Sequence, residues 1–371
     1  MSVKMRNSSI ELLKIFAMVL IIISHMMPSG EISSGIPHVI DLNCASASLQ
    51  GLLLILFRYC GQIGNAIFIV CSSYFLIESN KTKVEKIVNI LLDTWMISII
   101  YLISLMSMGY DITLYEVINN IFPLSFDHNW FVSHYIILYM IHPLLNRVIF
   151  SVGQKTLLII NMVLLILYSG VSFLLQGAFG YSRLIGFLVL YLLVAYTKLY
   201  LPITSKKIKP NVVALVLSVL GLVGLVVVTN AVALKTGFMS TQLLKWCAFI
   251  NPFIIVMAVS LLNLSLTRAF TSRFVNEVSS VTLLVYLIHE NVLLKSTVLN
   301  DIWKYIFEIY TYRYILVWVL IEVFVAVVVS WLLAFMYKHT LQRVVKKLCV
   351  FLYQKGGSFL NKGLIRLTNI K

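Results

Sequence analysis

Charged residues are scarce in this sequence, and their scarcity excludes an ordinary soluble fold. Asp, Glu, Lys and Arg make up 12% of the 371 residues, whereas hydrophobic residues make up 60%. A soluble globular chain is about 25% charged and about 45–50% apolar. A water-soluble fold has too little interior for this amount of apolar side chain, so the composition predicts that lipid surrounds much of the chain.

Acidic residues are the scarcer charged type, with 14 Asp and Glu against 29 Lys and Arg, for a formal net charge of +15. Such an excess often indicates nucleic-acid binding. Here the basic residues gather in short gaps between apolar runs, as in the cytoplasmic loops of membrane proteins. We therefore expect no nucleic-acid partner, and we assign most of these charges to topology and to contact with anionic membrane lipid.

Cysteine is also sparse, with five widely spaced residues and no C-x-x-C pair. This pattern indicates neither a disulfide framework nor a zinc site, so no metal is expected. A cleavable signal peptide is not evident either. The first apolar run ends at Ser24, His25 and Met26 without a small-residue cleavage site, which favours a retained membrane anchor.

Apolar runs recur along the whole chain, and about 20 helical residues cross a bilayer core of about 30 Å. The sequence therefore predicts an all-α polytopic membrane protein with about ten transmembrane helices. No long polar segment separates the runs, so residues 1–337 are expected to form one membrane domain. The predicted spans are 10–28, 57–77, 87–107, 131–150, 156–176, 183–201, 211–230, 247–265, 280–299 and 314–337.

The basic residues orient the predicted bundle. With the N-terminus inside, most Lys and Arg fall on the cytoplasmic side, whereas the gaps 29–56 and 108–130 contain none. The positive-inside rule therefore places both termini in the cytoplasm of a multi-pass cell-membrane protein. Residues 338–371 are basic and interleaved with apolar residues, which predicts an amphipathic cytoplasmic tail on the inner leaflet. Docking of a partner is the alternative role for this tail.

The first span carries the richest set of ionisable side chains. Glu11, Lys14 and His25 fall on one stripe of a helix with about 3.6 residues per turn. Ionisable groups inside a membrane are costly unless they face a polar interior, so this stripe is a candidate catalytic site. Imidazole is a common proton acceptor near neutral pH. The alternative is structural: Glu11 and Lys14 would pair at the inner interface, and His25 would be a satisfied core histidine.

Further polar side chains in or beside the spans are candidate substrate contacts. Tyr286 and His289 share a face of span 280–299, where hydrogen bonding between helices is the alternative role. Arg58 and Arg183 lie at predicted outer helix ends and could meet a sugar, an anionic group or a lipid headgroup. The remaining candidates in this set are Ser72, Trp130 and His134.

The chain resembles the acyltransferase family 3 membrane proteins, which include O-acetyltransferases of bacterial surface polysaccharides. Glu11, Lys14 and His25 are similar to the family's opening acid, base and histidine, although the family usually has Arg at the position of Lys14. The stretch 68–76 resembles the pattern Phe-x-x-x-Ser-Gly-Tyr-x-Leu, and 286–289 matches Tyr-Leu-x-His. A Trp-Phe … Tyr … Pro-Leu pattern is also present, and the resemblance spans about residues 6–337.

The resemblance implies a mechanism in which acetyl-CoA, the expected acyl donor, docks from the cytoplasm. Lys14, with Lys83 and Lys86 of the first basic loop, would bind the donor. His25 would be the catalytic base or carry the acyl group, and Glu11 would orient Lys14. The acceptor would be a hydroxyl of a surface glycan or lipid-linked saccharide that approaches past Arg58 and Arg183.

Two other classes of function remain open at this point. A transporter or flippase of a polysaccharide precursor would use the buried His, Lys and Glu as an intramembrane pathway. A non-catalytic scaffold for polysaccharide assembly would need these residues only for folding. Consumption of CoA thioester separates an enzyme from both alternatives.

Overall fold

The structure is a computed structural model that describes residues 7–27, 41–124, 129–171, 174, 182–201, 207–309 and 314–353. These residues are helical wherever they are regular, without a strand, which confirms the all-α prediction. The elements are α1 (Ser8–His25), α2 (Leu49–Leu76), α3 (Val84–Ser107), α4 (Leu114–Ile121), α5 (Trp130–Ser151), α6 (Gln154–Leu164), η2 (Leu165–Val171), α8 (Arg183–Tyr200), α10 (Ile208–Thr236), α11 (Pro252–Thr267), α12 (Arg273–Ser279), α13 (Thr282–His289), α14 (Val292–Leu294), η3 (Lys295–Leu299), α15 (Asn300–Ile309) and α16 (Ile315–His339).

Among the described residues, seven helices are long and apolar enough to cross a membrane. The two helical stretches 273–289 and 292–306 make an eighth if they count as one bent span. Two further predicted spans coincide with α5 and with α11, which has 16 residues. The chain is therefore a multi-pass membrane protein, and the figure of ten crossings stays a prediction.

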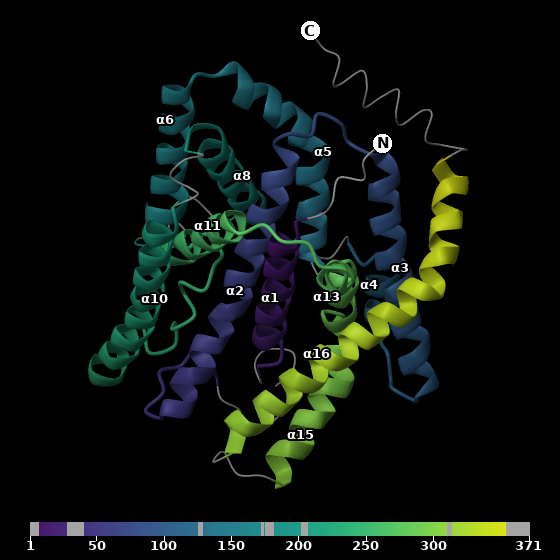
Figure 1. The fold of residues 1–371 in the computed structure, drawn as a ribbon. Helices are drawn as coiled ribbons and strands as arrows, with labels where there is room; N and C mark the ends of the chain where they lie inside the picture. Colours follow the sequence, from purple (N-terminus) through teal and green to yellow (C-terminus); the bar gives the residue numbers. More distant parts are fainter. Residues whose placement is uncertain are drawn as a thin grey trace.

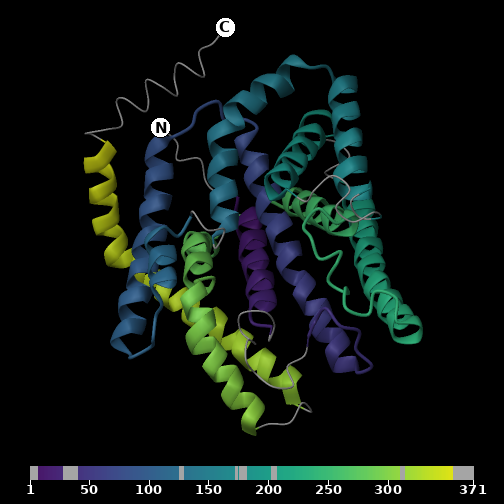
Figure 2. The same cartoon turned by 180° about the vertical axis from the view of Figure 1, so that it is seen from behind.

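The first helix is the centre of the bundle. It packs against α2, α11, α12, α13 and α16, and Figures 1 and 2 show it between α2 and α13 from both sides. The Asn7 side chain caps α1 by accepting a hydrogen bond from the Ser9 amide at 3.0 Å. Such a cap satisfies an amide that the helix itself leaves unpaired. The polar stripe of α1 is thus surrounded by protein.

Two glycines of α2 let this helix approach α1 closely. A Cβ atom at Gly64 would lie 2.5 Å from the Ala17 carbonyl oxygen, and one at Gly61 would lie 2.6 Å from the Ser24 hydroxyl. Small residues bring membrane helices into backbone contact, where dispersion attraction and weak polar contacts add up. Gly64 is the less replaceable of the two, because a backbone carbonyl cannot rotate away.

We expect Gly64→Ala to lower the free energy of unfolding by about 1–3 kcal/mol, because the added methyl overpacks a helix contact. Gly224→Ala is the matched control, since no atom lies within 4 Å of a Cβ at Gly224 of α10. Thermal unfolding of both variants in the same detergent measures the effect. Equal melting temperatures for the two would contradict this account of the α1–α2 contact.

The predicted span 280–299 differs in the structure from a single straight helix. It begins earlier, at α12, and bends by 57° between the stretches 273–289 and 292–306. The Asn291 side chain accepts the Leu294 amide and so starts a new helical turn at the bend. Glu290 and Asn291 occupy the break, where a polar pair interrupts the apolar run.

The chain after α16 is helical over residues 341–353 and packs along α3. The Asp93 carboxylate accepts hydrogen bonds from the Tyr337 hydroxyl at 2.9 Å and the Gln342 amide at 3.0 Å. Further on, the Cys349 thiol contacts the Glu85 carbonyl oxygen at 3.4 Å. Residues 341–353 therefore run antiparallel to α3. The rest of the predicted tail, 354–371, lies outside the described residues.

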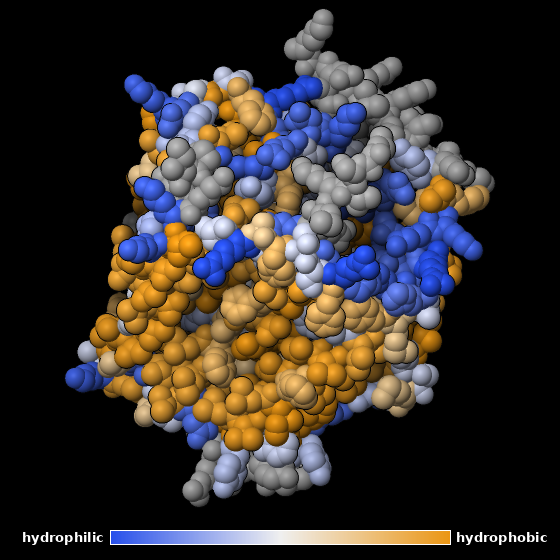
Figure 3. Space-filling view, viewed as in Figure 1, coloured by the Kyte–Doolittle hydropathy of each residue, from blue (hydrophilic) through white to orange (hydrophobic). Residues whose placement is uncertain are grey.

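The outer surface of the helices is broadly apolar. Figure 3 shows an extensive hydrophobic face bordered by a hydrophilic band towards one end. Large apolar side chains stay exposed on α10 and α16, among them Leu217, Leu220, Val228, Phe324 and Met336. Such a continuous apolar surface suits contact with lipid rather than water.

Candidate functional site

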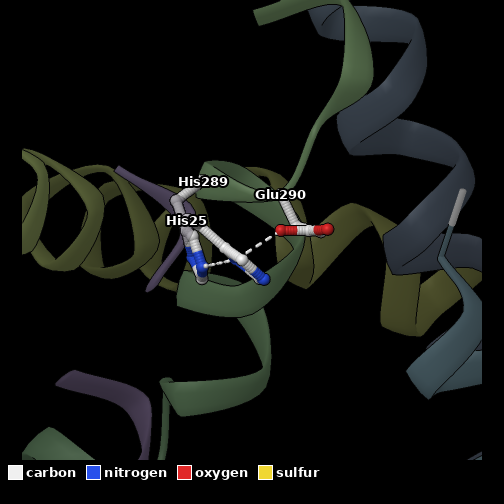
Figure 4. A group of neighbouring side chains, drawn as sticks. All are labelled: His25, His289 and Glu290. Carbon is white, nitrogen blue, oxygen red and sulfur yellow. Dashed lines mark hydrogen bonds and ion pairs between the residues drawn. The ribbon is translucent and has the colours of Figure 1, made fainter. Parts of the chain in front are cut away.

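The site forms where the end of α1 meets the break after α13. His25 is the last residue of α1, His289 is the last residue of α13, and Glu290 follows at the break. Figure 4 shows the three side chains converging from these two segments, which are 264 residues apart at the histidines. His289 reaches α1 because α13 packs against it, and Glu290 follows at the bend and contacts the same histidine of α1.

The three side chains form a closely connected polar cluster. The Nδ1 atom of His25 lies 3.1 Å from Nε2 of His289 and also contacts Oε2 of Glu290. The same carboxylate oxygen lies 2.8 Å from Nζ of Lys295, in η3. His289 is 2% exposed, and Glu290 and Lys295 are each 8% exposed. The carboxylate lies between an imidazole and an ammonium, and loss of Lys295 would leave its buried charge uncompensated.

The hydrogen-bond partners assign the ring tautomers. Nδ1 of His289 lies 2.7 Å from the Val285 carbonyl oxygen, which only accepts, so this nitrogen carries the proton. In neutral His289, Nε2 is then an acceptor that faces Nδ1 of His25. Glu290 is a second acceptor at the same atom, so Nδ1 of His25 carries a proton. The basic lone pair of His25 is therefore at Nε2, the arrangement that a carboxylate imposes on a catalytic imidazole.

The cluster also has a possible metal-ligand set, because single ligand atoms of His25, His289 and Glu290 lie within 4.8 Å of one another. Lys295 supplies a positive charge to the carboxylate at 2.8 Å, so the acid is neutralised by the chain itself. The proton on Nδ1 of His25 also occupies the nitrogen that a shared cation would need. The expectation of no metal stays a prediction.

A cavity of about 650 Å³ lies beside the N-terminal part of α1, a size typical of ligand sites. Its lining includes the candidates Glu11, Lys14, Ser72, Lys86 and Tyr286. The remaining wall is mostly apolar and comes from α1, α2, α3, α5 and α13. His25 and His289 do not line this cavity, so the predicted stripe divides into a cavity part and a histidine part.

Ion pairs and hydrogen bonds hold the polar wall of the cavity. Nζ of Lys14 lies 3.2 Å from Glu11, whose other oxygen accepts from the Ser279 hydroxyl at 2.5 Å. Nζ of Lys86 donates to the Tyr135 hydroxyl at 2.8 Å and lies 4.4 Å from the Tyr139 ring centroid. Glu11 thus links Lys14 to Ser279 of α12, and its predicted role in orienting Lys14 stays a prediction.

The other predicted residues fall outside the cavity lining. Trp130, His134 and Arg183 come together in an aromatic cluster, where the Arg183 guanidinium lies 4.7 Å from the Trp130 ring centroid. Arg58 donates to the Ser24 carbonyl oxygen at 2.7 Å and so caps the end of α1 next to His25. Lys83 is exposed at the start of α3. The predicted roles of these five residues in binding substrate or donor therefore stay predictions.

Sequence reasoning missed Glu290 and Lys295 as site residues. A signal was present, because Glu290 directly follows a histidine in an apolar run. Two adjacent ionisable residues inside a membrane span usually mark a functional site. The break of the helix could not be located from the pattern. Without the break, Glu290 would have pointed about 100° away from His289 around a regular helix.

Comparison with known proteins gives one family match. The model of acyltransferase family 3, described as an acyltransferase domain, matches residues 7–335. No curated protein and no solved structure matches the chain. The matched residues include the histidine cluster and the cavity.

Proposed function

The chain belongs to acyltransferase family 3, and from this premise we propose that it is an O-acetyltransferase of the cell membrane. The donor is cytoplasmic acetyl-CoA. The acceptor is a hydroxyl of an extracytoplasmic or lipid-linked glycan, as in the bacterial polysaccharide O-acetyltransferases that the sequence resembles. Family membership supports acyl transfer, and the donor and the acceptor are part of the proposal.

The observation that carries the proposal is the orientation of His25. Its Nδ1 side is occupied by Glu290 and His289, which leaves Nε2 as the nitrogen that can accept a proton. A transporter would also use buried ionisable residues, but it has no need for a single histidine tautomer. A positioned imidazole with a carboxylate behind it is an arrangement suited to deprotonating a hydroxyl.

The cavity supports a donor of the size and charge of an acyl-CoA. Lys14 and Lys86 line it and could meet the donor's anionic phosphates, and the mostly apolar wall suits its pantetheine arm. The starts of α1 and α12 meet at the same end, where Ser8 donates to the Asn276 side chain at 2.9 Å. In the predicted topology this end faces the cytoplasm, the compartment of the donor.

In the proposed step, the acceptor oxygen attacks the thioester carbonyl carbon while Nε2 of His25 takes the hydroxyl proton. The carbon–sulfur bond breaks, an ester forms, and the proton passes from Nε2 to the departing CoA sulfur. Glu290 stabilises the imidazolium that exists between these proton transfers. In a two-step transfer the same Nε2 would be acylated, and CoA would then be released in a burst before acceptor is added.

Labelled acetyl-CoA tests the proposal. Purified protein in lipid nanodiscs is mixed with labelled acetyl-CoA and a membrane fraction that contains the native glycans. We expect equimolar release of CoA and appearance of alkali-labile label in the glycan. Movement of saccharide across reconstituted vesicles without loss of thioester would support the transporter alternative and contradict the proposal.

We expect Lys86→Met to raise the KM for acetyl-CoA by roughly tenfold with little change in kcat, because an ammonium near donor phosphates contributes binding. The variant should also lose part of the salt dependence of KM, since salt screens exposed charges. Lys155→Met is the control, an exposed lysine at the start of α6. Identical KM values for both variants would remove Lys86 from the donor site.

A further inference from the structure

Two aromatic rings, Phe131 of α5 and Tyr286 of α13, form part of the cavity wall on the side of the histidines. Both line the cavity, and their ring centroids lie 5.7 Å apart at an interplanar angle of 49°. Phe131 is 8% exposed and Tyr286 is 3% exposed. Among the lining residues, Tyr286 and Ile21 come nearest to the histidines along the chain.

This pair of rings, here called the aromatic layer, adjoins the histidine cluster through Tyr286. Ile21 precedes His25 by four residues and Tyr286 precedes His289 by three, which corresponds to about 6 Å and about 4.5 Å along each helix. The Tyr286 ring meets the His289 ring edge-on, with centroids 5.9 Å apart. The Tyr286 ring therefore lies between the cavity that it lines and the ring of His289.

The layer is supported by further rings, so displacing it requires several side chains to shift together. The Phe131 ring contacts Phe187 at 5.4 Å and Phe68 at 6.2 Å between centroids. Phe187 is fully buried and also packs edge-on against Phe249 at 5.8 Å. A close-packed aromatic cluster resists insertion of additional methylene groups.

We propose that Tyr286, together with Phe131, limits the acyl group that this protein transfers to acetyl. This inference rests on the proposed function, because it concerns the donor of that same reaction. A donor that enters from the cavity approaches Nε2 of His25 with its acyl group first, so the acyl group is the part that meets the aromatic layer. An acetyl group brings one methyl to the rings, whereas each further methylene of a longer chain has to displace them further.

The test compares acetyl-, butyryl- and hexanoyl-CoA as donors for the protein in nanodiscs, with the glycan-containing membrane fraction as acceptor. Release of CoA thiol gives kcat/KM for each donor. We expect the wild type to prefer acetyl- over butyryl-CoA by at least ~10-fold, the scale of discrimination for small changes in an apolar pocket. Tyr286→Ala and Phe131→Ala should lower this preference by at least ~10-fold by opening the layer.

Two further variants serve as a control for truncating a ring and as a substitute for a variant that does not fold. Phe253→Ala is a matched truncation, because Phe253 packs against Gly221 between α10 and α11 and does not line the cavity. It should keep the donor preference of the wild type. Tyr286→Leu removes the ring but keeps apolar volume, and it replaces Tyr286→Ala if that variant does not fold. Size-exclusion chromatography checks folding.

The outcomes separate the two proposals. A wild type that consumes acetyl- and butyryl-CoA equally well overturns the chain-length inference but leaves acyl transfer intact. So does an unchanged preference in folded Tyr286→Leu and Phe131→Ala proteins that still consume acetyl-CoA. A wild type that consumes no acyl-CoA overturns the proposed function and this inference with it.

Discussion

Replacing His25 with Gln is expected to lower the rate of acetyl transfer by about 10²–10⁴-fold, the typical contribution of a positioned general base. Glutamine keeps a polar side chain of similar length but has no basic nitrogen at the position of Nε2. The KM for acetyl-CoA should change little, because His25 does not line the cavity. Initial rates with labelled acetyl-CoA, at saturating donor, measure the loss.

The control for this variant is His339→Gln, which alters an exposed histidine at the end of α16. It should keep wild-type activity. If His25→Gln, folded and of normal melting temperature, transferred acetyl groups at the wild-type rate, the proposed mechanism would be wrong. The family membership would stand, and the base would have to be sought elsewhere among the cavity residues.

Replacing Glu290 with Gln is expected to lower kcat by about 10²-fold or more, with KM for acetyl-CoA nearly unchanged. The amide cannot stabilise an imidazolium, and it can offer an N–H to Nδ1 of His25 and so reverse the tautomer. Lys295, which lies 2.8 Å from the carboxylate, also loses its partner. Glu290 acts through His25, so it is a positioning residue.

The conservative variant Glu290→Asp distinguishes positioning from a role in folding alone. It keeps the carboxylate and should retain part of the activity that Glu290→Gln loses. Glu78→Gln is the control, since Glu78 is an exposed acid that pairs with Lys198 at 3.1 Å. Equal activity of Glu290→Asp and Glu290→Gln, in proteins of equal stability, would argue against an electrostatic role for this side chain.

The class of protein follows from the sequence, for a local reason. In lipid, each backbone amide and carbonyl needs a partner within the protein, so an apolar run of about 20 residues has to be helical. The sequence also determines that Glu11, Lys14 and His25 share one face of α1, because the helical period decides which side chains point the same way. These properties depend on neighbours along the chain, and the described part of the structure is all-α with at least seven helices able to span a membrane.

The tertiary structure decided which side chains act together. Glu290 reaches His25 only because the helix breaks after His289, and Lys295 meets Glu290 because the chain turns back into a helix there. The same packing placed Glu11 and Lys14 at the cavity, whose lining does not include His25. Contacts across 264 residues depend on how helices pack, and a local pattern carries no information on which distant face a side chain will meet.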